Sequence, residues 1–146
     1  MEQLILHLIG DYVTQSDWMA NEKTKRSWPA FCHALVYSLP FLLIGSATAV
    51  LVIFLTHFAI DRWRLAVFVV YAKNLLLCPQ FWRYAFCGYP AGEWGPFLAW
   101  DREYQWNNCK ATGYPSERPA WLAVWLLIAA DNTLHLASNW GALRWL

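Results

Sequence analysis

The chain has 146 residues, of which 58% are hydrophobic and 14% are charged, and its formal net charge is +1. Soluble domains are usually about 45–50% apolar and about 25% charged, so this composition favours a lipid environment. The near-zero charge and the lack of a long basic run argue against a nucleic-acid partner. The length fits one domain, and we expect residues 1–146 to form a single membrane domain.

Three apolar stretches predict the helices of this domain. Apolar residues recur at helical spacing over residues 2–19. The stretch from Ser27 to Ile60 has no charged residue. As one helix it would be about 50 Å long, against a hydrocarbon core of about 30 Å. We therefore predict a hairpin of helices at about 29–44 and 47–77, broken near Gly45, and a last helix at about 119–145.

Residues 78–118 are rich in aromatic residues, Gly and Pro, which is typical of a folded loop or cap. A disulfide between Cys87 and Cys109 in this cap requires an oxidising compartment. The predicted fold is all-α: an integral-membrane helical bundle of four to five helices, with the aromatic-rich loop or cap before the last helix. So thin a bundle favours a homo-oligomer, and a soluble helical bundle is the alternative.

Basic residues flank both open ends of the predicted hairpin. Because positive charge is enriched on the cytoplasmic side of membranes, we expect these ends to face the cytoplasm. The residues are Lys23, Lys25, Arg26, Arg62 and Arg64.

The four histidines of the chain fall in four different predicted helices. Three of them have an aspartate four residues away: His7 with Asp11, His57 with Asp61, and His135 with Asp131; the fourth is His33. Residues four apart lie on the same face of a helix. Ionisable side chains at membrane depth are costly and usually face the bundle interior, where they serve function.

Imidazole and carboxylate groups together suit zinc and other first-row divalent metals, and a cation would balance the buried aspartates. We predict a divalent metal ion as cofactor, with zinc as the first choice and manganese or iron as alternatives. The predicted ligands are His7, Asp11, His33, His57, Asp61, Asp131 and His135. Seven groups exceed the needs of one tetrahedral ion, so two ions, or one ion with outer Asp–His pairs, both fit.

A catalytic metal would activate a bound water, and a spare carboxylate could accept its proton. The candidate catalytic residues are Asp11, Asp61 and Asp131, together with Gln15, which extends the first stripe by one turn and would orient water or substrate. Two alternatives stay open. The pairs could be inert, with Arg62 and Arg64 neutralising Asp61, or they could form an ion or proton pathway.

Four segments of the chain resemble a known family. They are HLIGDYVTQSDWMA from His7, HALVYSLPFLL from His33, THFAIDRWR from Thr56 and ADNTLHL from Ala130. They are similar to bacterial and phage membrane proteins grouped as domain of unknown function 3307. The segment TGYPSERPAWLAVWLLIAADNTLHL from Thr112 looks like the C-terminal half of a phage-type member. The resemblance implies a multi-pass protein of the bacterial inner membrane, and the similarity of the C-terminal segment implies that it is phage-encoded. The resemblance implies no activity.

These observations together predict a membrane-embedded metal-binding protein. We expect a metal-dependent hydrolase that acts on a lipid or another membrane-associated substrate. The alternative is a non-enzymatic phage or host membrane factor, in which the aromatic cap binds a partner protein.

Overall fold

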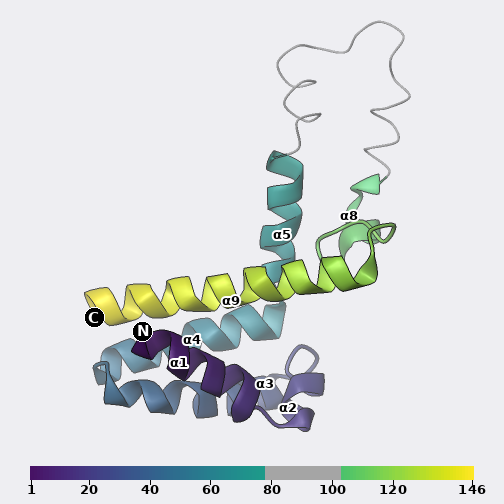
Figure 1. Cartoon of the computed structure of the whole chain (residues 1–146). Coiled ribbons are helices and arrows are strands. Elements are labelled where there is room, and N and C mark those ends of the chain that lie inside the picture. Colours follow the sequence, from purple (N-terminus) through teal and green to yellow (C-terminus); the bar gives the residue numbers. More distant parts are fainter. Residues whose placement is uncertain (78–102) are drawn as a thin grey trace, which may run out of the picture. The chain divides into compact units, whose positions relative to one another are not determined.

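The computed structural model describes residues 1–77 and 103–146 (Figure 1). All regular secondary structure assigned in these ranges is helical. The predicted all-α class is therefore confirmed for the described part of the chain. The chain divides into two compact units: unit 1 comprises Met1–Leu65 and Asp131–Leu146, and unit 2 comprises Ala66–Ala130. Most of the predicted cap, including Cys87, lies outside the described residues.

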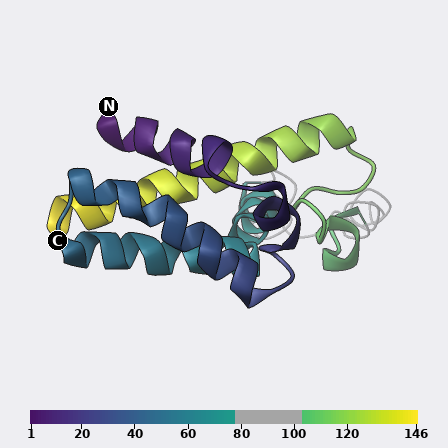
Figure 2. The same cartoon turned by 90° about the horizontal axis from the view of Figure 1, so that it is seen from below.

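Unit 1 is a bundle of helices around a small apolar core. Its elements are α1 (Glu2–Leu8), the π-helical turn η1 (Ile9–Val13), α2 (Asp17–Glu22), α3 (Ser27–Ser38), the 3-10 turn η2 (Leu39–Leu43), α4 (Ala47–Trp63) and the C-terminal part of α9 (Ala120–Trp145). Figure 2 shows α3 and α4 lying antiparallel beside one another. Tyr37, Phe41, Ile53 and Ala142 are buried together, so α3, η2, α4 and α9 share one core.

Two predicted helices are each broken in the structure. The first ends at Val13, because the Thr14 N–H bonds to the Ile9 carbonyl five residues back (2.9 Å) and closes a π turn. A new helix then begins at Asp17, with Ser16 as its N-cap; the Ser16 hydroxyl accepts from the Met19 N–H (3.3 Å). The helix predicted over 47–77 is interrupted by Arg64, which adopts a left-handed conformation with φ of 52°. One such residue stops an α-helix.

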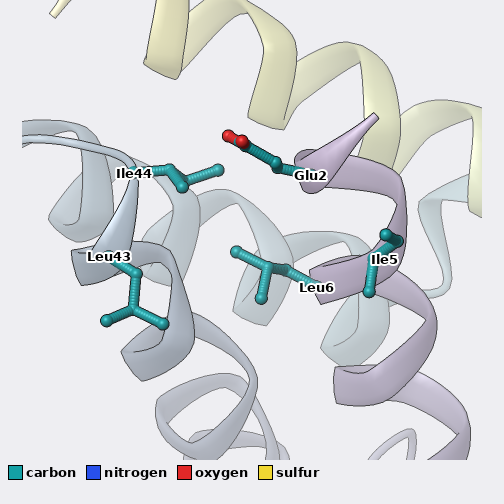
Figure 3. A pocket seen from close by; sticks show the side chains of 5 residues that line it. All are labelled: Glu2, Ile5, Leu6, Leu43 and Ile44. Atoms are coloured by element: carbon teal, nitrogen blue, oxygen red, sulfur yellow. The ribbon is translucent and has the colours of Figure 1, made fainter.

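An apolar pocket of about 220 Å³ opens between the start of α1 and the end of η2 (Figure 3). It is lined by Glu2, Ile5, Leu6, Leu43 and Ile44. No predicted metal ligand or catalytic residue is among the lining residues, so the predicted chemistry must be sought elsewhere in unit 1.

Unit 2 contains α5 (Leu65–Leu76), α8 (Trp106–Cys109) and the first part of α9. The Asn74 amide donates to the Gly113 carbonyl (2.8 Å), and the Tyr71 hydroxyl donates to the Tyr104 carbonyl (2.8 Å). Cys109 is a buried free thiol whose pKa is raised by burial and then by the nearby Glu117 and Glu103 carboxylates. The hydrogen bonds of Asn74 and Tyr71 attach the polar segment after residue 102 to α5.

The helix α9 is the one helix in the described ranges that is long and apolar enough to cross a bilayer. Its 26 residues give a length of about 39 Å. The apolar segments Ser27–Leu43 and Leu65–Leu76 are shorter.

Unit 2 depends on the absence of a side chain at position 113. Gly113 has φ of +80°, and a Cβ there would lie 2.7 Å from the Val67 carbonyl oxygen and 2.8 Å from Val70. We expect Gly113→Ala to lower the free energy of unfolding by about 1–3 kcal/mol, because it combines a left-handed conformation with a clash against backbone. The control is Gly141→Ala, where a Cβ meets nothing within 4 Å. Thermal unfolding of the purified protein checks this, and equal melting temperatures for the two variants would contradict it.

Candidate metal centre

Each of the three His–Asp pairs closes within one helical turn in unit 1. The ring nitrogen to carboxylate oxygen distances are 3.4 Å for His7–Asp11, 3.2 Å for His57–Asp61 and 3.5 Å for His135–Asp131. All four histidines of the chain are at most 1% exposed. The pairs therefore point into the bundle from α1 and η1, from α4 and from α9.

His33 on α3 joins the first pair to the second. Its Nε2 lies 3.2 Å from Asp11 Oδ1 and 3.2 Å from Asp61 Oδ2. The Nε2 atoms of His33 and His57 lie 2.9 Å apart. In a tetrahedral site with bonds of about 2.0–2.1 Å, ligand atoms are about 3.3–3.4 Å apart. The 3.2 Å separations are close to this value, and the 2.9 Å between the two imidazole nitrogens would have to widen by about 0.4 Å for both to bind one ion.

Candidate ligand atoms gather in three overlapping groups among the described residues. Within each group, one ligand atom from every residue lies within 4.8 Å of the others. The groups are Asp11 with His57 and His135, His33 with His57 and Asp61, and Asp61 with Asp131 and His135. Six of the seven predicted ligands are thus brought together. Because any two groups share one residue, the cluster can hold one ion or two neighbouring ions.

Several polar atoms in this cluster are buried without a hydrogen-bond partner. They include both ring nitrogens of His135, Nδ1 of His57 and Oδ1 of Asp11, whereas Oδ2 of Asp61 lies 3.0 Å from the Lys23 ammonium group. A buried polar group left without a partner costs about 1–3 kcal/mol, and a charged group costs more. A divalent cation would give the carboxylate oxygens and imidazole nitrogens the electrophile they lack.

His7 is the predicted ligand that stands outside the three groups. Its Nδ1 is hydrogen-bonded to the Tyr37 hydroxyl (2.8 Å), and its Nε2 to Asn132 Oδ1 (3.0 Å). Both nitrogens are therefore engaged, and His7 contacts the cluster through Asp11. This arrangement is typical of a group that orients a ligand from outside the coordination shell.

Tyr37 is a residue of this site that the sequence analysis did not single out. It is fully buried, and its hydroxyl accepts from the Asn139 amide (2.6 Å). Its ring stacks on His57 with centroids 3.6 Å apart. Tyr37 and Asn139 each follow a histidine by four residues, at His33 and His135, so the same four-residue spacing could have indicated both.

The first helix changes geometry where it meets this tyrosine. A Cβ on Gly10 would lie 2.4 Å from the Tyr37 ring, so only glycine allows this approach. Asp11 follows directly in the π turn, a distortion often found at functional sites. Gln15 no longer continues the stripe of His7 and Asp11, because the helix has ended. It lies in the link before α2, outside the three groups, with its buried Oε1 unpaired.

Lys23 is a further residue of this site that the sequence analysis missed, since it was assigned to the membrane flank. Its Nζ lies 3.0 Å from Asp61 Oδ2 and 3.3 Å from His33 Nε2, and its side chain is only 16% exposed. Arg62, an expected partner of Asp61, instead donates to the Thr24 carbonyl (3.0 Å). One ammonium group thus faces a cluster that contains three carboxylates.

Comparison with known proteins identifies the family but no activity. The family model described as protein of unknown function (DUF3307) matches residues 1–83. The chain therefore belongs to this family, as the sequence resemblance predicted. No curated protein and no solved structure matches the chain. The matched region contains Lys23, His33, His57 and Asp61.

The hydroxyl of Tyr37 is expected to stabilise the site through its two buried hydrogen bonds. Tyr37→Phe keeps the ring on His57 but removes the partner of the Asn139 amide and leaves His7 Nδ1 only its 3.4 Å contact with Asp11. We expect a loss of about 1–3 kcal/mol in the free energy of unfolding. Tyr114→Phe, which removes an exposed bond to Lys73 (2.7 Å), should cost less than about 1 kcal/mol. Chemical unfolding in detergent measures both, and a neutral Tyr37→Phe would refute this role.

Proposed function

We propose that this member of the DUF3307 family is a helical membrane protein that binds a divalent cation and uses it to hydrolyse a membrane-associated substrate. The convergence of His33, His57 and Asp61 carries the proposal. Their ligand atoms are 2.9–3.2 Å apart, on two helices, and are buried. Inert polar pairs would satisfy each other within a helix and would not need to meet.

The ligand chemistry favours zinc, with manganese or iron as alternatives. The candidate groups offer imidazole nitrogens and carboxylate oxygens and contain no thiolate. Mixed nitrogen and oxygen sets bind first-row divalent metals. This set of ligands resembles that of hydrolytic zinc sites. Those sites combine histidine with a carboxylate and keep one position open for water.

The proposed chemistry is the addition of water to an ester. A cation in the cluster would make a bound water more acidic. Asp131 is the most exposed carboxylate of the cluster, with 33% of its side chain accessible, and it is suited to accept the water proton and pass it to the leaving group. Asp61, which is almost fully buried, is suited to hold the cation instead.

Exposed apolar surface supports a multi-pass position in the bacterial inner membrane. Soluble monomers rarely expose large apolar patches. Unit 1 exposes large apolar side chains along η2 and α4, namely Leu39, Leu42, Leu43, Leu51 and Leu55. The α3–η2 and α4 rods each have 17 residues, or about 25 Å, close to a thin hydrocarbon core. Exposed Trp28 and Trp63 lie at the end of the hairpin that carries the basic residues, which suits a cytoplasmic interface.

The metal site predicts a defined loss of bound ion. We expect about one or two equivalents of a first-row metal in detergent-purified protein, measured by plasma mass spectrometry. Asp61→Asn and His57→Ala should each lower this content at least about tenfold, because each removes a residue shared between two ligand groups. Asp17→Asn is the matched control, since Asp17 is an exposed carboxylate on α2. Full metal content in both site variants, or none in folded wild type, would overturn the proposal and favour pairs that only join helices.

The membrane assignment predicts resistance to alkaline extraction. The expressed protein should remain in the membrane fraction after a carbonate wash, because exposed leucines and α9 would be embedded in lipid. A peripheral protein in the same membranes serves as the control for the wash. Recovery of the chain in the supernatant, as a dispersed species, would show that the exposed apolar surface is covered in another way.

A further inference from the structure

The position of Lys23 identifies the class of substrate. We propose that Lys23 binds the phosphoryl group of an anionic substrate beside the cation, an inference that rests on the proposed function above. Three observations carry it: the place of the ammonium group beside the ligand triangle, the contacts that hold it there, and the electrostatics of a loaded site.

The ammonium group of Lys23 lies beside two corners of the triangle formed by His33 Nε2, His57 Nε2 and Asp61 Oδ2. The sides of this triangle are 2.9, 3.2 and 3.2 Å. The Lys23 Nζ is 3.0 Å from Asp61 Oδ2 and 3.3 Å from His33 Nε2. Two atoms that bind one tetrahedral ion lie about 3.3–3.4 Å apart, so the ammonium group is about as far from these two candidate ligands as a further ligand would be. A cation held by these three residues would therefore have the Lys23 ammonium group beside it, close enough for Lys23 to contact an anion bound to that cation.

The chain holds this lysine in place from two sides. Lys23 directly follows α2 as its C-cap, and its N–H bonds to the Met19 carbonyl (2.9 Å). The next residue, Thr24, accepts through its carbonyl from the Arg62 guanidinium on α4 (3.0 Å), and Arg62 also donates to Ser27 (3.2 Å). The α2–α3 turn is thereby tied to the helix that carries His57 and Asp61.

An ammonium group and a divalent cation this close repel each other unless an anion lies between them. A phosphoryl group provides several oxygens, so one oxygen can face the cation while another accepts from Lys23. Lysine is a common phosphate-binding residue because its charge is compact. If Lys23 were only the counter-ion of Asp61, the bound cation would displace it and it would serve no further purpose at the site.

Hydrolysis of such a group is balanced by water alone. The water oxygen forms a bond to phosphorus, the bond from phosphorus to the ester oxygen breaks, and one water proton passes to the leaving alcohol. Lys23 would neutralise the phosphoryl oxygens throughout. The same phosphoryl chemistry occurs in a phospholipid headgroup and in a soluble phosphate.

The test uses full-length protein loaded with Co²⁺, whose visible absorption reports changes in its ligands. Inorganic phosphate and dihexanoyl phosphatidic acid are titrated separately. We expect both to change the wild-type spectrum, and Lys23→Met to raise the half-maximal concentration at least tenfold without lowering the cobalt content. Lys25→Met is the matched control, since Lys25 is exposed and paired with Glu22 (3.0 Å), and it should change the midpoint less than twofold. Lys23→Arg should keep the midpoint within about threefold.

Each outcome decides the proposal. Equal midpoints in wild type and Lys23→Met, or no phosphate effect on a cobalt-loaded protein, overturn the role of Lys23 but leave the metal site standing. A wild-type protein that binds no cobalt overturns the metal site and this inference together. A response to phosphate but not to the short-chain lipid supports phosphoryl binding and assigns a soluble source. If Lys23→Met does not fold, Lys23→Gln, which can still bond to Asp61, gives the same readings.

Discussion

Burial of charge is the constraint on which unit 1 depends. Four imidazoles and the Asp61 carboxylate are withdrawn almost completely from water inside a bundle whose surface is largely apolar. Such groups are tolerated only when they face one another or a cation, because an isolated buried charge is far more costly than a polar pair. The helices must therefore present their polar stripes to a common point. His33, which has no aspartate partner on its own helix, lies at that point and contacts Asp11 and Asp61.

This convergence explains local features that look irregular when taken alone. The π turn at the end of the first helix carries Asp11, and Gly10 beside it lets the Tyr37 ring approach the backbone. Tyr37 in turn stacks on His57 and bonds to His7 and Asn139, so a single buried hydroxyl connects α1, α3 and α9. The apolar core of Phe41 and Ile53 supports this polar layer from the adjoining turns of the same helices. The first helix thus departs from regular α-helical geometry at the residues that contact the site.

The distribution of charge around the cluster gives it a direction. Lys23 comes from the α2–α3 turn, the end of the unit at which α4 carries Arg62. The apolar pocket lies between the start of α1 and the end of η2, at the other ends of these helices. Asp131 and Lys23, whose side chains are 33% and 16% exposed, are the most accessible charged groups around the buried ligands. Unit 1 thus has charged groups at one end of these helices and an apolar pocket at the other.

The sequence by itself determined the helical class, the family and the three His–Asp pairs, because a spacing of four residues specifies a shared face within one helix. It also indicated the break between α3 and α4 near Gly45. Only the tertiary structure decided that His33 joins the pairs, that His7 turns toward Tyr37 and Asn132, and that Lys23 enters the cluster. Those contacts link positions 10 to 125 residues apart, and they depend on how helices rotate against one another. Gln15 leaves the face shared by His7 and Asp11 for the same reason, because a tertiary contact is involved. The π turn forms where Gly10 packs against Tyr37, and the periodicity of the first segment does not predict it.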